Sequence, residues 1–219
     1  MSRWAVREVE RKRRRDASLM SKAEKNRRPR GRPHGDEVRV AILKAANKLL
    51  EEQGVGGFTI EGVAALSGAA RSSIYRWWPS RGALAMAGFL ADTAPKIAYP
   101  VSASPIADIR KQMQRVARVY GGKVGRTIAA IVAEGQGDPE TLRAFIEGYA
   151  RPRRADAKRV LERGIACGEL RPDIDLEVVL DALYGPITYR LLVPHGPLTP
   201  KWAGALADHV FSDLRRKSA

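Results

Sequence analysis

Residues 59–81 read TIEGVAALSGAARSSIYRWWPSR, and this stretch organises the rest of the chain. Its pattern predicts two short helices that are separated by a tight turn. Thr59 is suited to cap the first helix, because its hydroxyl can accept a backbone N–H bond. Apolar residues then recur at spacings of three and four as far as Leu66, as they do on one face of a helix. Gly68 favours a left-handed turn, and a second helix is predicted over residues 70–77.

The second helix combines buried apolar positions with a polar and basic face. Ile74 and Trp78 are predicted to be buried, and no acidic residue occurs between Arg71 and Arg81. The pattern is that of a helix-turn-helix, in which the second helix enters the DNA major groove. A plain surface helix pair is the alternative. The residues expected at the DNA from this stretch are Thr59, Arg71, Ser72, Ser73, Tyr75, Arg76, Trp77 and Arg81, with Arg71 as the base reader and Tyr75 and Arg81 as phosphate contacts.

The resemblance extends well beyond this helix pair. Residues 38–89 resemble the DNA-binding domain of the tetracycline-repressor (TetR) family. The shared pattern includes Gly68-Ala69, Ile74-Tyr75-Arg76 and Trp78-Pro79-Ser80-Arg81. Two positions depart from it, since the family often has a capping serine where this chain has Ala70, and a histidine where it has Trp77. The resemblance implies a dimeric, ligand-responsive transcriptional regulator.

Composition agrees with a polyanionic partner. The 219 residues carry a formal net charge of +15, which suggests nucleic acid or an anionic membrane surface. No apolar run approaches the roughly 18 residues of a membrane helix, so a membrane partner is not expected. One cysteine, Cys167, fits a reducing compartment. The expected location is the cytoplasm, in association with the nucleoid.

A basic arm is predicted over residues 1–35, which hold 13 Lys and Arg against 4 Asp and Glu. Few of its residues are apolar, so we expect it to be disordered in the free protein. The segment Pro29-Arg30-Gly31-Arg32-Pro33 resembles an AT-hook, in which Arg30 and Arg32 enter a narrow A·T minor groove. A solubilising tail is the alternative, and Met20 is an alternative translation start that keeps both arginines.

The remaining sequence predicts an all-α protein. A helix-turn-helix domain is expected over residues 36–92, and a helical regulatory and dimerisation domain over residues 93–219. Helices are predicted at 36–53, 60–66, 70–77, 81–92, 104–120, 123–134, 138–167 with a kink near Pro152, 175–193, and 199–215. Prolines at 95 and 100 mark the domain boundary.

Two sets of residues in the second domain follow from the family resemblance. The last two helices are apolar enough to pair with their copies in a second chain. The residues expected in this dimer interface are Leu183, Ile187, Leu191, Trp202 and Leu206. A pocket for an apolar small-molecule effector is expected among the central helices, with candidates Met113, Tyr120, Phe145, Tyr149, Tyr184 and Tyr189.

No catalytic constellation is visible in the sequence. The three histidines lie far apart, and none pairs with a cysteine or carboxylate at metal-ligand spacing. We therefore expect no enzyme activity, no metal and no cofactor. The expected function is a repressor that binds a palindromic operator in double-stranded DNA as a homodimer and is released by a small molecule. Two alternatives are an architectural protein that coats A·T-rich DNA without an effector, and a protein-interaction scaffold.

Overall fold

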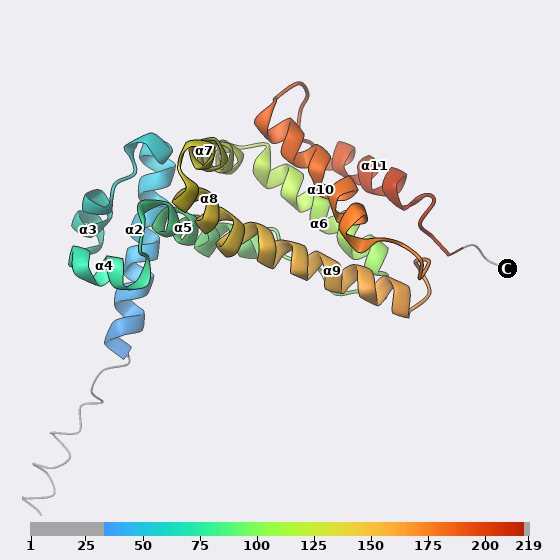
Figure 1. Ribbon diagram of the computed structural model, residues 1–219, viewed down its shortest axis with the longest axis horizontal. Coiled ribbons are helices and arrows are strands. Elements are labelled where there is room, and N and C mark those ends of the chain that lie inside the picture. Colours follow the sequence, from blue (N-terminus) through green and yellow to red (C-terminus); the bar gives the residue numbers. More distant parts are fainter. Residues whose placement is uncertain (1–32, 217–219) are drawn as a thin grey trace, which may run out of the picture. The chain divides into compact units, whose positions relative to one another are not determined.

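The computed structural model describes residues 33–216 (Figure 1). Arg30 and Arg32, the expected minor-groove pair, lie outside the described residues. The described part of the chain is built from helices and contains no β-strand, apart from an isolated bridge between Leu170 and Arg215. This architecture confirms the predicted all-α fold class. No described helix combines the length and the apolar content that a membrane span requires.

Four helices, α2 to α5, contain the stretch that organises the chain. They are α2 (Pro33–Gly57), α3 (Ile60–Ser67), α4 (Arg71–Trp77) and α5 (Arg81–Lys96). The hydroxyl of Thr59 accepts the N–H of Gly62 at 3.0 Å, which confirms the predicted cap. Gly68 ends α3 with φ of 70°, a left-handed conformation that glycine adopts without steric cost. The helix predicted to end at Gly54 breaks there, where φ is 67°, and a further turn runs to Gly57.

The apolar faces of these helices meet in one core. Ile42, Phe58, Val63 and Ile74 are all fully buried. Gly88 on α5 brings that helix close to α2, since a Cβ at this position would lie 2.7 Å from the Cβ of Ala46. The packing therefore holds α3 and α4 against one shared core.

The second half of the chain contains α6 (Pro105–Tyr120), α7 (Lys123–Gly137), α8 (Pro139–Phe145), a π-helical turn η1 (Ile146–Ala150), α9 (Arg151–Ala166), α10 (Leu176–Leu192) and α11 (Pro200–Phe211). The helix predicted over 138–167 is thus continuous through α8, η1 and α9, and η1 is a wider turn within it. In η1 the N–H of Arg151 bonds to the carbonyl of Ile146, five residues back. This wider turn precedes Pro152, which has no N–H to donate to the helix.

Helix α6 is the centre of this second half. It contacts α7, α9, α10 and α11, and it buries Ile109, Met113 and Ala117 completely. Asp108 is also buried on α6, where its carboxylate accepts the N–H of Ser102 at 3.1 Å and faces Arg163 at 3.5 Å.

Helix α5 joins the two halves through contacts with α8 and η1. At its start, a Cβ on Gly82 would lie 2.4 Å from the hydroxyl of Thr141 on α8, so this close approach requires glycine. Helix α5 continues through residue 92 and includes Pro95 in its last turn. The domain limits 36–92 and 93–219 remain a prediction.

Candidate DNA-binding interface and ligand cavity

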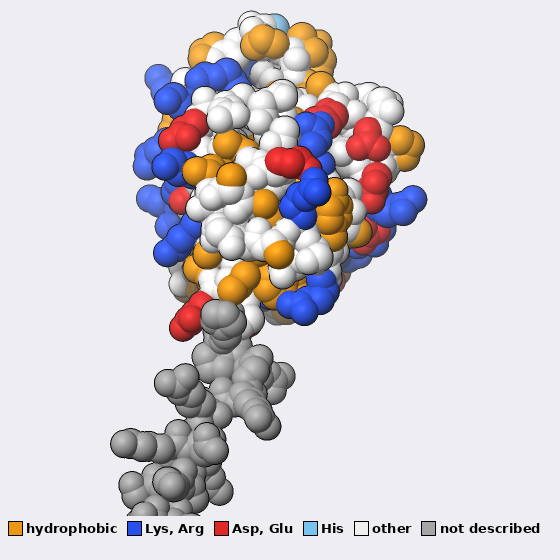
Figure 2. Space-filling view, turned by 90° about the vertical axis from the view of Figure 1, so that its left-hand side faces the viewer, with side chains coloured by type: hydrophobic (Ala, Val, Ile, Leu, Met, Phe, Trp, Pro, Cys, Tyr) orange, Lys and Arg blue, Asp and Glu red, His pale blue; other side chains and the backbone are white. Residues whose placement is uncertain are grey.

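Helix α4 presents a polar face to solvent. Arg71, Ser72, Tyr75 and Arg76 are exposed, whereas Ser73 and Trp77 are half-buried. Ile74 is fully buried and Trp78 nearly so, as predicted, and together they hold α4 against the core. Figure 2 views the side where α3 and α4 lie, and basic and acidic side chains are both exposed there with apolar patches between them.

Arg71 is not free in the absence of DNA. Its Nη1 lies 2.8 Å from Oε1 of Glu61 on α3, and both side chains are largely exposed. The hydrogen bond from Arg71 lowers the pKa of Glu61 below its ordinary value. An ion pair this exposed contributes little to stability, and here it links the start of α4 to α3.

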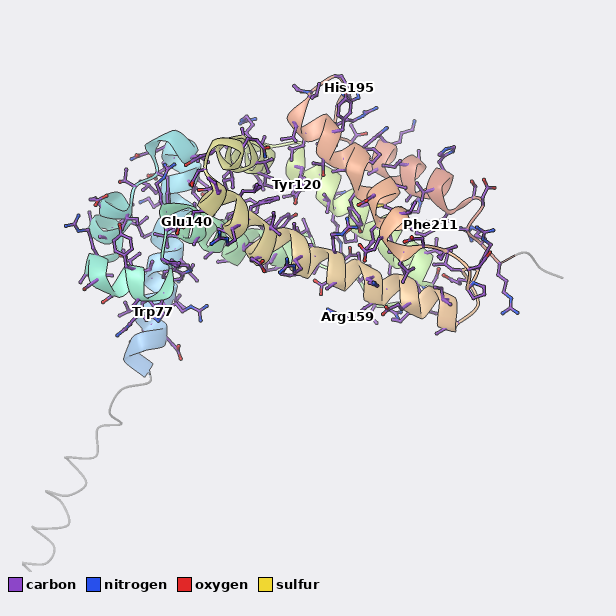
Figure 3. All side chains as sticks on the ribbon, in the orientation of Figure 1. Trp77, Tyr120, Glu140, Arg159, His195 and Phe211 are labelled. Atoms are coloured by element: carbon purple, nitrogen blue, oxygen red, sulfur yellow. The ribbon has the colours of Figure 1, made fainter. Side chains whose placement is uncertain are left out.

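The C-terminal end of α4 carries an aromatic and cationic cluster. The guanidinium of Arg76 lies 5.0 Å from the ring centre of Trp77, within reach of a cation–π contact. Trp77 in turn meets Trp78 edge to face at 5.8 Å, and Figure 3 labels Trp77 at this end of the helix. Ala70 at the other end has an extended conformation but no side chain that could cap α4. The start of the helix therefore lacks the cap that a serine would supply.

Arg81 has a different environment from the other expected DNA contacts. Its Nη1 donates to the carbonyls of Val55 and Phe58, each at 3.2 Å, and its Nη2 pairs with the carboxylate of Glu134 on α7. The guanidinium is thus engaged within the protein, between the residues before α3 and a helix of the second half. This arrangement does not favour the expected phosphate contact.

A cavity of about 230 Å³ lies among the helices of the second half. Four of the six expected pocket residues line it, namely Tyr120, Phe145, Tyr149 and Tyr184. Figure 3 labels Tyr120, the last residue of α6. Met113 and Tyr189 are not among the residues that line this cavity: Met113 is fully buried in the core, and Tyr189 is 58% exposed on α10. Helical periodicity could not separate these positions, since aromatic and large apolar residues occur on several faces.

Polar residues that the sequence did not single out also line the cavity. The hydroxyls of Tyr99 and Tyr184 lie 2.6 Å apart, and Tyr184 donates to Oε1 of Gln112 at 2.8 Å. Gln112 in turn donates to the carbonyl of Ile97 at 3.1 Å. Burial raises the pKa of Tyr99 to about 12 and raises the pKa of Tyr149 and of Tyr184 as well. All three hydroxyls therefore keep their protons at neutral pH.

Tyr120 lines the same cavity but takes no part in this network. Its hydroxyl is buried and has no hydrogen-bond partner among the described residues. An unsatisfied buried polar group costs about 1–3 kcal/mol, which a ligand could recover by bonding to it.

Replacing Tyr120 with Phe should therefore leave the free energy of unfolding unchanged or raise it by about 1 kcal/mol, because the unpaired hydroxyl disappears. The matched control is Tyr184→Phe, which removes two hydrogen bonds and should cost about 1–3 kcal/mol. Urea denaturation followed by circular dichroism measures both. If both variants lose the same free energy of unfolding, the Tyr120 hydroxyl is hydrogen-bonded in solution.

Comparison with known proteins assigns these features to one family. Residues 42–87 match the bacterial regulatory proteins of the tetR family, and residues 100–210 match the tetracyclin repressor-like C-terminal domain. The uncharacterized HTH-type transcriptional regulator YdeS of Bacillus subtilis (strain 168) is 33% identical over 190 residues, which cover 87% of this chain and 96% of that protein. The chain belongs to the TetR family.

Two further relatives of this TetR-family protein agree with the assignment. The crystal structure of the TetR family transcription regulator SCO0332 has 32% sequence identity and a TM-score of 0.74, and the match covers 81% of this chain and 98% of that one. The DNA-binding transcriptional repressor TetR of Mycobacteroides abscessus is 26% identical, with coverage of 84% and 97%. The protein is thus a DNA-binding transcriptional regulator, and TetR-family members of this kind are not enzymes.

Helix α10 of this TetR-family chain has one face inside the protomer and one outside. Leu183 and Ile187 are 0% and 2% exposed, which corrects their expected place in a dimer interface, because they pack within the protomer and leave no surface for a second copy. Leu191, Trp202 and Leu206 are half-buried. The outer face of α10 carries Val178, Ala182, Gly185, Tyr189 and Leu192, all exposed.

Side chains that often carry catalysis or bind metals are scattered in this TetR-family structure. Within residues 33–216, no three His, Cys, Asp or Glu side chains gather as a metal site would require. Cys167 is exposed at the end of α9, and its thiol lies 3.5 Å from the carbonyl of Gly164. Its surroundings give it no role in the DNA interface or the cavity.

Proposed function

We propose that this protein is a homodimeric repressor that acts on chromosomal DNA in the cytoplasm, at the nucleoid. It binds a palindromic operator through α3 and α4 and is released when a small molecule enters the cavity. The main support is the exposed polar face of α4 within the segment that matches the TetR-family DNA-binding domain. The cavity within the matching C-terminal domain supports the effector site.

The exposed residues of α4 divide into two roles. Arg71, at the leading end, reads a base edge, while Tyr75 holds a phosphate. Ser72, Ser73, Arg76 and Trp77 complete the contact surface. Thr59 contributes through α3, because the helix that it caps presents its N-terminus, a favourable position for a phosphate, beside the DNA.

Arg81 connects the cavity to the DNA-binding helices. Helix α7 contributes Ile128 and Val132 to the cavity wall, and two residues later Glu134 pairs with Arg81. Arg81 also holds the carbonyls of Val55 and Phe58, directly before α3 begins. A ligand that shifts α7 therefore acts on the position of α3.

The dimer forms through the outer face of α10. Exposed residues on this face recur at alternating spacings of four and three, from Val178 to Leu192, as in helices that pack against a partner. Val178 and Tyr189 are 64% and 58% exposed, which is high for large apolar side chains that a folded protomer leaves uncovered. Gly185 and Ala182 between them allow close approach of a second helix.

Replacing Val178 with Asp should convert the dimer into monomers, because it places a charge in an apolar contact between two protomers. The matched control is Val101→Asp. Val101 is 87% exposed, lies between α5 and α6, and is outside this face. Light scattering after size-exclusion chromatography reports the mass of each variant. Dimers from both variants would place the interface elsewhere.

The basic arm over residues 1–35 adds affinity beside each half-site, with Arg30 and Arg32 as the minor-groove pair. Replacing both with Ala should remove any preference for A·T flanks and lower the slope of log K against log salt by about 0.9 for each phosphate that the arm no longer neutralises. The Lys double variant keeps the charge but loses the planar guanidinium, so it should lose the flank preference too. If the Lys double variant binds operators with A·T-rich and with G·C-rich flanks as tightly as the original protein does, the arm contributes only electrostatic attraction.

Footprinting over a range of salt concentrations tests the proposed function directly. A repressor protects a discrete palindrome, and this protection persists at salt concentrations that abolish non-specific binding. Broad protection of A·T-rich tracts would instead indicate an architectural protein, which the comparisons do not support. Absence of any complex at low salt would indicate the scaffold.

A further inference from the structure

The cavity of about 230 Å³ has walls of two kinds. Aliphatic side chains of α6, α7 and α10, among them Val116, Ile128 and Ile187, form one part. Aromatic rings form the other, and Phe145 and Tyr149 lie 5.4 Å apart at an angle of 42°. An apolar cavity of about 150 Å³ in another protein holds benzene, so this space suits a compact molecule that is somewhat larger than a single ring.

A second, more open cavity adjoins the first. It has a volume of about 380 Å³ and is lined by Ala98, Tyr99, Arg153, Asp156, Arg159, Val160 and Arg163. Tyr99 and Arg153 line both cavities. They therefore lie where the apolar cavity meets a more open cavity that three arginines line.

Among the arginines that line the two cavities, Arg153 has the longest ion-pair distance. Arg154, which also lines the first cavity, is held by Glu177 at 2.6 Å and by Asp181 at 2.5 Å. Arg163 donates to the carbonyl of Ser102 at 2.9 Å and faces the buried Asp108. Arg153 instead meets Asp156 at 3.6 Å, and Asp156 is shared with Arg159.

The surroundings of Arg153 favour an anion. Its side chain is 25% exposed and makes no hydrogen bond within the described part of the chain. Its positive charge reaches the hydroxyls of Tyr99, Tyr149 and Tyr184, where it opposes the effect of burial on each pKa. A half-buried guanidinium with one distant partner leaves donors for a planar oxyanion, and the guanidinium fork matches a carboxylate.

We propose that the cavity binds a small aromatic carboxylate, with its ring between Phe145 and Ile128 and its carboxylate at the guanidinium of Arg153. This inference rests on the proposed function, since it names the chemical class of the effector. Aromatic rings attract one another in edge-to-face and offset arrangements, and Phe145 and Tyr149 offer such contacts. The unpartnered hydroxyl of Tyr120 provides a second donor inside the same cavity.

The test uses the full chain without DNA and three probes. 2-Naphthoate is the aromatic acid, 2-naphthylmethanol is its neutral analogue, and octanoate is an aliphatic acid. Isothermal titration should give an affinity for 2-naphthoate that exceeds that of the alcohol by about tenfold or more, as expected for a charged hydrogen bond. Octanoate should bind more weakly than 2-naphthoate.

Variants then locate the carboxylate. Arg153→Met should lower the affinity for 2-naphthoate by about tenfold or more and leave that for the alcohol unchanged. Arg153→Lys should retain part of the preference for the acid. The matched control is Arg154→Gln, at the neighbouring residue, which lines the same cavity but is already neutralised by two carboxylates, and it should keep the preference intact.

Several results would overturn the inference. In the original chain, these results are equal affinities for 2-naphthoate and the alcohol, a higher affinity for octanoate than for 2-naphthoate, or no binding of 2-naphthoate. In Arg153→Met, the result is an undiminished preference for the acid. If Arg153→Met does not fold, the inference is still tested by Arg153→Lys and by the affinities of the original chain for 2-naphthoate and for the alcohol. Operator binding is measured separately, so failure of the probes beside an intact operator complex overturns only this inference, whereas loss of the operator complex overturns the proposed function.

Discussion

Replacing Leu183 with Asp should unfold the helices of the second half rather than separate a dimer. Leu183 has no exposed surface, and α10 packs there against α6, α7, α9 and α11. Removing a buried leucine side chain already costs about 2–5 kcal/mol, and an unpaired carboxylate adds the cost of burying a charge or of protonating it. The sum is a large part of the roughly 5–15 kcal/mol that stabilises a typical domain.

Thermal denaturation followed by circular dichroism measures this effect, with Leu183→Met as the control. The methionine variant keeps the volume and apolar character of the site and should lose less than about 1.5 kcal/mol. A folded Asp variant that had lost only its dimeric state would contradict the burial of Leu183. It would also restore the residue to the interface that the sequence pattern suggested.

The second large effect is expected from Arg71→Ala. Arg71 projects from the leading end of α4, and among residues 33–216 its ion-pair partner is the exposed Glu61. Removing a bidentate hydrogen-bonded pair with a base should cost about 1–3 kcal/mol in each half-site and relax the preference at one base pair. Binding to a set of operator variants, each changed at one position, measures both quantities.

Two comparisons separate base reading from charge. Equal weakening on all operator variants would show that Arg71 contacts only a phosphate, and the salt slope would then fall by about 0.9 for each phosphate that is no longer neutralised. Glu61→Gln removes a negative charge beside the DNA but keeps Arg71, so it should raise affinity on every variant and keep the base preference. Loss of that preference in Glu61→Gln would show that Glu61 directs the Arg71 side chain.

Local rules were enough to predict the helix-turn-helix. The cap at Thr59, the left-handed Gly68 and the burial of Ile74 each depend on residues a few positions apart in the chain. Such short-range features can be predicted from sequence because they depend on the backbone preferences of single residues and on the helical period. The family pattern over residues 38–89 then connected this local structure with DNA binding.

The faces of the later helices were harder to predict. Helix α10 is apolar on nearly all sides, so its sequence could not show that Leu183 faces the core while Val178 and Tyr189 face solvent. The same ambiguity placed Met113 and Tyr189 in the pocket. Only the packing of α10 against its neighbours decides which side is inside.

The sequence by itself therefore determined the all-α class, the order and limits of most helices, and the helix-turn-helix pair α3 and α4, because these follow from local periodicity and caps. The tertiary structure alone brought Arg81 to Glu134, which is 53 positions away, and Tyr99 to Tyr184, which is 85 positions away. It also left Arg153 with one distant acidic partner while Arg154, its neighbour in sequence, has two close ones. Pairings of this kind depend on how the helices pack in space, since burial and charge are properties of the surroundings that residues distant in sequence create together.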